Sequence, residues 1–154
     1  MLFAKLVRTD GKGDLLLSGG LVVAVFETKG QTVIRTAAGG ENASFVVSET
    51  AEDVAEKLSS LGVKLVQFTR NKDGGAIQFN VAQIVAVYQR TDNAVIRTTA
   101  GGEHAEYVVA EAMSTAVDVV AAAMAEKQQE APNEEAMVTS LVGREPKRSK
   151  GSRR

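Results

Sequence analysis

The 154-residue sequence contains no cysteine, no tryptophan, two prolines and one histidine. Without cysteine there are no disulfides, thiol nucleophiles or thiolate metal ligands. The lone His104 gives a histidine-based metal site or a catalytic triad little to work with. No apolar run approaches the ~18 residues of a membrane span, and the N-terminus lacks the pattern of a signal peptide. We therefore expect a soluble, cytoplasmic protein that is not an enzyme and has no cofactor, metal site, small-molecule substrate or membrane partner.

Basic residues are scarce outside the C-terminal end of the chain. The segment REPKRSKGSRR (144–154) holds six basic side chains and one acidic side chain, a net charge of +5, whereas the rest of the chain carries 12 basic and 18 acidic groups, a net charge of −6. A basic end on an acidic body is typical of an arm that binds a polyanion, because phosphate contacts release counterions. The alternative is a solubilising terminus that contacts nothing specific or contacts the acidic body. The candidate nucleic-acid-binding residues are Arg144, Lys147, Arg148, Lys150, Arg153 and Arg154.

The sequence does contain an internal repeat, which aligns without gaps when Val33 is placed on Val95. The segment VIRTAAGGENASFVVSE (33–49) then matches VIRTTAGGEHAEYVVAE (95–111), and the tripeptide Val-Ala-Val occurs at both 23–25 and 85–87. We call this shift, from position 33 to position 95, the repeat offset, and the residues that it relates are counterparts. A repeat of this kind predicts a repeated structural unit, which we interpret as a tandem duplication.

Each repeat has the pattern of short strands followed by a helix. In the first repeat, strand-forming segments at 2–8, 15–17, 21–27, 32–36 and 43–48 are separated by turn residues, which predicts a β-meander. The hydrophobic period then changes to that of a helix, with Thr50 as the predicted N-cap and Gly62 as the C-terminal stop. In the second repeat we expect a longer helix from about Met113, with Ser114 as its cap.

The predicted fold class is α+β, with two tandem β-meander-plus-helix repeats that share a core and a flexible C-terminal arm. We expect the first repeat at 1–62, the second at 63–130 and the arm, ending in the basic tail, at 131–154. A unit of about 60 residues buries a marginal core, so both repeats and both helices should pack into a common core. Remaining sheet edges must be covered or paired, which predicts a homo-oligomer or a larger protein assembly. The apolar segment 137–142 within the arm could add a strand to such an edge.

A set of strand, turn and helix residues in each repeat carries a resemblance to a known family. In the second repeat the resembling residues are Phe79, Asn80, Ile84 to Val87, Val95, Ile96, Gly101, Gly102, Tyr107 to Val109, Glu111 and Val117 to Val120. In the first repeat they are Thr32 to Ile34, Gly39, Gly40, Phe45 to Val47, Glu49 and Val54. Through these residues the repeated unit resembles the FlbD/SwrD-like family of small proteins. The resemblance covers roughly the range 1–125, twice over, and implies a role in flagellar motility without catalytic chemistry. This chain differs in being duplicated and in its basic tail. At fold level it is also similar to PUR and Whirly modules, which hold single-stranded nucleic acid.

Other constellations do not indicate catalysis. His104 takes the position of Asn42 in a turn, so we interpret it as a solvated turn residue. The glycine pairs at 39–40 and 101–102 lie between two predicted strands, not between a strand and a helix, so they do not predict a phosphate-binding loop. Glu49 and Glu111 recur at the strand-to-helix junctions, where we expect a structural role.

Arginines recur at strand positions of both repeats, Arg8 with Arg70 and Arg35 with Arg97. These four are secondary candidates for contacts with nucleic-acid phosphates. The alternative, which we favour, is cross-strand ion pairing. The expected partners are the repeated glutamates Glu41, Glu103, Glu49 and Glu111.

These observations favour a non-enzymatic binding protein that associates with nucleic acid, either RNA or single-stranded DNA, through its basic C-terminal tail. The five Phe and two Tyr all fall in predicted strands, so few rings are expected to stack on bases and binding should be electrostatic. The alternative is a structural or adaptor protein that self-assembles through sheet edges within a larger complex, such as a flagellar-type or phage particle. Its expected location would then be a virion or another intracellularly assembled particle.

Overall fold

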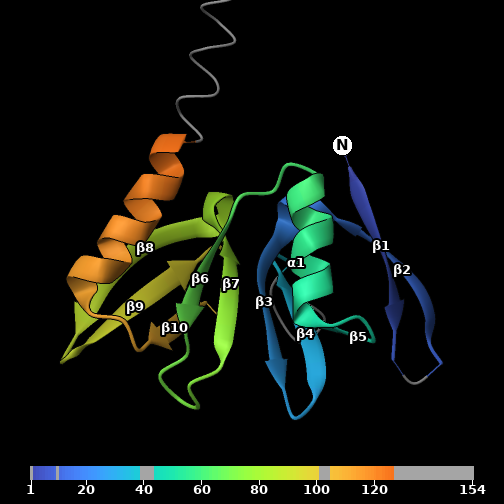
Figure 1. The fold of residues 1–154 in the computed structure, drawn as a ribbon, viewed down its shortest axis with the longest axis horizontal. Coiled ribbons are helices and arrows are strands. Elements are labelled where there is room, and N and C mark those ends of the chain that lie inside the picture. Colours follow the sequence, from blue (N-terminus) through green and yellow to red (C-terminus); the bar gives the residue numbers. More distant parts are fainter. Residues whose placement is uncertain (1, 10, 39–43, 101–104, 127–154) are drawn as a thin grey trace, which may run out of the picture.

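The computed structural model describes residues 2–9, 11–38, 44–100 and 105–126. Over these ranges the chain is rich in β-structure, with antiparallel sheets and two α-helices. Figure 1 shows two halves side by side, each with one helix. We refer to residues 2–62 as the N-terminal half and to residues 63–126 as the C-terminal half.

The strands of both halves follow the order expected from the sequence. The N-terminal half contains β1 (Phe3–Arg8), β2 (Gly13–Ser18), the 3-10 turn η1 (Gly19–Leu21), β3 (Val22–Thr28), β4 (Gln31–Thr36), β5 (Ser44–Val47) and α1 (Ala51–Ser60). The C-terminal half contains β6 (Leu65–Thr69), β7 (Ala76–Asn80), η2 (Val81–Gln83), β8 (Ile84–Arg90), β9 (Asn93–Thr98), β10 (Glu106–Val109) and a helix over residues 113–126.

The helix ends show which sequence signals were informative. Thr50 is the N-cap of α1, because its hydroxyl oxygen accepts a hydrogen bond from the Asp53 N–H at 3.1 Å. Gly62 follows the helix with φ +90°, a conformation that glycine adopts without steric cost. The prediction of Ser114 as the second cap is wrong. The Ala116 N–H donates to the Ala112 carbonyl, so the helix begins at 113 and Ser114 lies inside its first turn.

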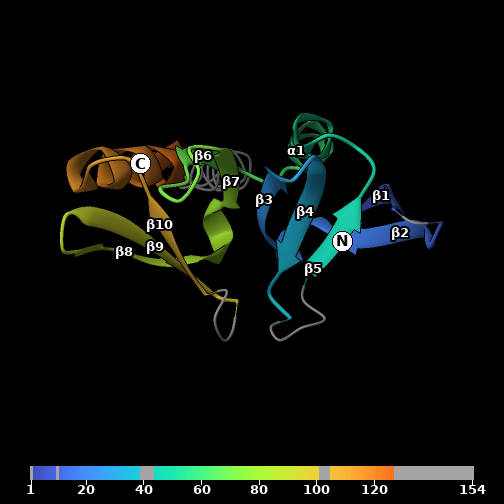
Figure 2. The same ribbon diagram turned by 90° about the horizontal axis from the view of Figure 1, so that it is seen from below.

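The strands form a seven-stranded sheet of order β2-β1-β5-β4-β3-β7-β6 and a three-stranded sheet of order β10-β9-β8. The prediction of a β-meander is wrong, because the consecutive strands β2 and β3 do not pair and β1 lies between β2 and β5. An isolated antiparallel bridge between Arg70 and Val109 connects the end of β6 to β10. The halves meet where β3 pairs with β7, with Ala24, Val25 and Phe26 opposite Phe79, Gln78 and Ile77. We call this contact the junction. Among the described strands, β2 and β8 each lack a neighbour on one side, and they lie at opposite ends of the molecule (Figures 1 and 2).

Several backbone hydrogen bonds recur at the repeat offset. In each half, the backbone N–H of the first residue of the 3-10 turn donates to the carbonyl of the residue just before the first strand. The Gly19 N–H donates to the Leu2 carbonyl at 3.2 Å, and the Val81 N–H donates to the Lys64 carbonyl at 3.0 Å. The residue that follows the last strand of each half also donates to the first strand. The Ser48 N–H donates to the Val7 carbonyl and the Ala110 N–H donates to the Thr69 carbonyl, both at 2.8 Å. The halves therefore share their local strand arrangement.

Buried side chains form two clusters, and the two helices pack on different ones. Val54 and Leu58 of α1 belong to one cluster, which we call the α1 cluster, while Ala116 and Val120 of the second helix belong to the other. The expectation of a common core for both helices is therefore wrong, although the second cluster also takes residues from the N-terminal half. The reason lies in β3, which is buried on both faces. A bulge between Val22 and Ala24 shifts its register, and β3 contributes side chains to both clusters.

Candidate functional site

The residues first predicted to bind nucleic acid lie outside the described part of the chain. This applies to Arg144, Lys147, Arg148, Lys150, Arg153 and Arg154, and also to His104, Glu41, Glu103 and both glycine pairs. The described residues do include all four repeated arginines. Within the described ranges, no group of three or more His, Cys, Asp or Glu residues could hold a metal ion, and no helix is long and apolar enough to cross a membrane.

Arg35 and Arg70 converge on the ring of Phe26 at the junction. Their guanidinium carbons lie 5.1 Å and 4.8 Å from the ring centroid, within the range of a cation–π interaction. Arg70 also donates to the Glu27 carbonyl at 2.6 Å, and Arg35 donates to the Tyr107 hydroxyl at 3.4 Å. Phe26 is 6% exposed, so these guanidinium groups are used to pack the two halves together.

The other two repeated arginines have partners within their own halves. Arg8 donates to the Lys12 carbonyl at 2.5 Å, in the turn between β1 and β2. Arg97 pairs with Glu106 at 2.9 Å. Of the two interpretations of the arginines, these contacts favour the structural one.

The predicted role of Glu49 and Glu111 as partners of these arginines is wrong. The Glu49 carboxylate accepts the Val7 N–H at 3.1 Å and pairs with Lys57 at 3.5 Å. The Glu111 carboxylate accepts the Thr69 N–H at 3.0 Å. β1 pairs with β5 at a single residue, and β6 pairs with β10 only at the Arg70–Val109 bridge. Each carboxylate therefore accepts a hydrogen bond from a first-strand N–H that has no partner in the neighbouring strand. The expected structural role therefore holds, with backbone groups as partners.

A charged cluster that sequence reasoning missed lies across β8, β9 and β10. Glu106 accepts a hydrogen bond from the Tyr88 hydroxyl at 2.5 Å and pairs with Arg90 at 2.7 Å and with Arg97. The hydrogen bonds from Tyr88 and Arg90 lower the pKa of Glu106, and the bond to Glu106 raises the pKa of Tyr88. Glu106 has Ser44 as its counterpart in the first repeat, so a search for repeated charges passed over it. The cluster places a carboxylate next to both arginines.

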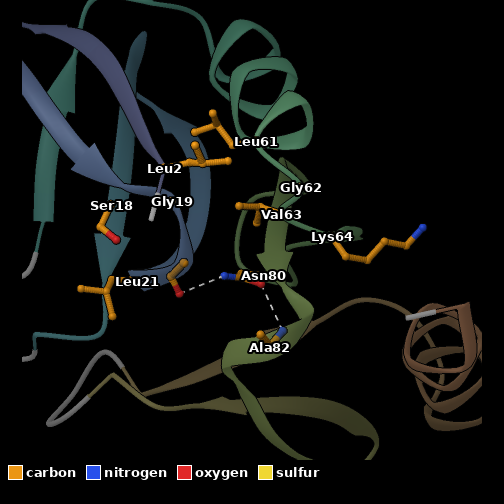
Figure 3. A pocket seen from close by; sticks show the side chains of 11 residues that line it. Leu2, Ser18, Gly19, Leu21, Leu61, Gly62, Val63, Lys64, Asn80 and Ala82 are labelled. Carbon is orange, nitrogen blue, oxygen red and sulfur yellow. Dashed lines mark hydrogen bonds between the residues drawn. The ribbon is translucent and has the colours of Figure 1, made fainter. Parts of the chain in front are cut away.

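A pocket of about 580 Å³ lies at the junction, between η1 and the start of β6 (Figure 3). Its apolar lining includes Leu2, Leu21 and Leu61. The buried Asn80 amide is occupied by the backbone, donating to the Val22 carbonyl at 2.9 Å and accepting from the Ala82 N–H at 3.1 Å. Lys64 pairs with Glu126. The polar groups named here are thus engaged in internal contacts, and the pocket presents mainly apolar walls.

Comparison with known proteins gives no family for the chain. No family model matches it, and no curated protein matches it. Among solved structures, it is similar to the LytTr DNA-binding domain of a Bacillus cereus protein described as a methyl-accepting/DNA response regulator. The TM-score is 0.47 at 15% sequence identity, covering 76% of this chain and 92% of that one. A likeness of this extent carries no functional argument.

Proposed function

We propose that the protein is a non-enzymatic binding protein that associates with nucleic acid, RNA or single-stranded DNA, through Arg144, Lys147, Arg148, Lys150, Arg153 and Arg154. The observation that carries this proposal is the separation of charge along the sequence, +5 over residues 144–154 and −6 over the rest. A polyanion is attracted to the first segment and repelled by the second.

The contacts of the body support placing the binding function in the tail. Arg35 and Arg70 are used at the junction, and Arg97 lies beside a carboxylate. Six of the seven aromatic side chains are buried or half-buried, and Phe3, 49% exposed, is the exception. A body of this kind offers few cations for phosphates and few rings for bases.

Substitution of the six basic tail residues by glutamine tests the proposal, with a variant of the same tail composition in scrambled order as the matched control. We expect the glutamine variant to fold normally and to lose nearly all binding to a labelled single strand, whereas the scrambled tail binds like the original. On a single strand the slope of log affinity against log salt should lie between about −2.8 and −3.5, as four or five phosphate contacts require. Unchanged binding by the glutamine variant would contradict the proposal and make Arg8 and Arg97 the next residues to test.

A second candidate function is a structural or adaptor protein that self-assembles within a larger complex, such as a flagellar-type or phage particle. The observation that favours it is that the strands β2 and β8 both end their sheets, as far as the structure describes the chain, without a neighbour. Open strand edges are templates for pairing with another chain. A concentration-dependent mass in light scattering, unchanged by deletion of residues 144–154, would support this candidate.

We also propose that the chain is a tandem duplication of one module of short strands and a helix, of the FlbD/SwrD-like kind. The hydrogen bonds that recur at the repeat offset support this proposal. Expressing residues 1–62 and 63–130 separately tests the predicted boundaries. Two fragments that associate into a folded complex would agree with two modules, and fragments that remain unfolded when mixed would count against these boundaries.

A further inference from the structure

The same tripeptide, Val-Ala-Val, has opposite environments in β3 and β8. In β3 it is fully buried, with Val23 at 0% exposure, because β7 pairs alongside and the C-terminal half covers it. In β8 its counterpart Val85 is 60% exposed. β8 has β9 as its strand neighbour on one side, and on the other side no strand from the described ranges pairs with it. The open side of β8 is therefore equivalent to the side of β3 that forms the junction.

The strand that would fit β8 by this equivalence is β2, the counterpart of β7. The Gly19 N–H donates to Leu2 at the start of β1, and backbone groups alternate in direction along an antiparallel strand. The backbone N–H and carbonyl of Leu16, an odd number of residues earlier, thus point away from β1. The Leu16 side chain is 64% exposed, so both its backbone and its side chain are open to a partner.

Exposed apolar side chains around β2 lie at positions whose counterparts line the junction. Gln78 pairs with Val25, Gln83 donates to the Gly20 carbonyl at 2.6 Å, and Leu65 packs against the α1 cluster. The counterparts of these three residues are Leu16, Leu21 and Phe3, with exposures of 64%, 53% and 49%. The free end of the N-terminal half thus presents apolar surface where the C-terminal half already has a partner.

We infer that β8 of one copy of this chain pairs antiparallel with β2 of a second copy, reproducing the β3–β7 junction between chains. The register follows from the junction by the repeat offset, with Ala86 opposite Leu17, Val87 opposite Leu16 and Tyr88 opposite Leu15. All six of these side chains are apolar or aromatic, so pairing adds apolar burial to the backbone hydrogen bonds.

The junction also gives Arg8 a place in this interface. Arg70, its counterpart, lies over Phe26 and donates to the Glu27 carbonyl. By the same offset, Arg8 of one copy lies over the Tyr88 ring of the next and reaches the Gln89 carbonyl. An arginine over a tyrosine face is attracted by the negative charge of the ring face, so this contact would add to the pairing.

The interface is head-to-tail, since β2 and β8 are different surfaces at opposite ends of the molecule. After one such contact, one copy keeps its β2 edge open and the other keeps its β8 edge open, so further copies can add until a ring closes or a filament forms. This inference rests on the proposed self-assembly and specifies its contact. It is independent of nucleic-acid binding by the tail.

Two variants of the full chain, each blocking one edge, test the pairing. Leu16→Pro removes the outward N–H of β2, a change that edge strands tolerate, and Leu16→Asp is a second variant in case the proline disturbs folding. Val85→Lys places a charge on β8 at the counterpart of Val23, which is fully buried in the cluster that includes Phe79 and Val81 of the C-terminal half. Val7→Lys is the matched control, because Val7 is 43% exposed on β1 and its counterpart Thr69 belongs to neither buried cluster, unlike Val23.

We expect the unmodified chain and Val7→Lys to form the same oligomer in light scattering. Leu16→Pro and Val85→Lys should each be monomeric, with association weakened about tenfold or more. A mixture of the two blocked variants should form a 1:1 dimer, because one retains an intact β8 and the other an intact β2.

Three results would overturn the inference. A monomeric unmodified chain would reject self-assembly altogether, whereas an oligomer that survives either blocked variant would reject this pairing and leave self-assembly standing. Loss of the oligomer on deletion of residues 131–154 would show that the segment 137–142 of the arm occupies an edge instead.

Discussion

β3 and β8 have closely similar sequences and the same hairpin partner arrangement, but β3 is buried on both faces and β8 is a half-exposed edge. The difference follows from the neighbouring strand, since β7 covers β3 and no strand of the described chain covers β8. Local sequence therefore sets strand formation, while the exposure of each strand depends on which strand pairs next to it.

The two equivalent surfaces also differ in the chemistry of their residues. At the junction, the partner surface of the C-terminal half uses the amides of Asn80 and Gln83 to donate to backbone carbonyls of η1 and β3. At the free end of the N-terminal half, the same positions are Ser18 and Leu21. The junction is thus fixed by specific hydrogen bonds, whereas the free end depends on apolar contact and pairing of backbone groups.

The largest effect is expected from a direct comparison of the repeated valines. Val23→Lys buries a charge without a partner and should reduce the free energy of unfolding on the order of 4 kcal/mol. Val85→Lys, measured where the chain is monomeric, should change it by about 0.5 kcal/mol or less, because the side chain is 60% exposed. Urea denaturation gives both values, and equal losses at the two positions would refute the difference between β3 and β8.

A smaller effect is expected from the amide that joins the halves. Asn80→Ala removes the donor to the buried Val22 carbonyl and the acceptor for the Ala82 N–H, which should cost about 1–3 kcal/mol. Ser18→Ala is the matched control, because no side-chain cap hydrogen bond links Ser18 to η1, and it should be nearly neutral. A loss in Ser18→Ala as large as in Asn80→Ala would contradict the role given to the Asn80 amide.

The smallest effect concerns Glu106, whose counterpart Ser44 carries no charge. Because hydrogen bonds from Tyr88 and Arg90 lower its folded-state pKa, Glu106 stabilises the fold above its unfolded-state pKa. This contribution falls as the pH decreases through the folded-state value. Unfolding curves against pH for the unmodified chain and Glu106→Gln should differ near neutral pH and converge in acid. Divergence that grows towards acid pH would show the opposite sign.

The strands and helices could be predicted from the sequence because their signals are local. Alternation, turn glycines and the Thr50 cap determine backbone conformation over a few residues, and the repeat offset transfers each expectation to the second half. The packing could not be predicted, because it depends on the bulge in β3, which presents Val22 and Val23 to different clusters.

The partners of the repeated charges could not be predicted for a similar reason. Arg35 shows why, because its guanidinium lies over Phe26 of its own half and bonds to Tyr107 of the other half, a contact between halves that no local signal indicates. The predicted partners Glu41 and Glu103 lie outside the described residues. The basic tail was identified from charge alone and lies outside the described residues.

The exposure of β8 supplies the most direct measurement of the central claim, that β8 is an open junction surface completed by β2 of another copy. Amide hydrogen exchange of residues 22–28 and 84–90 should be followed in dilute and in concentrated protein. We predict that β3 amides are protected at both concentrations and that the outward-facing amides of β8, together with that of Leu16, gain protection only in the associated protein. Protection of β8 that is the same in monomer and oligomer, or absent from both, would contradict the claim.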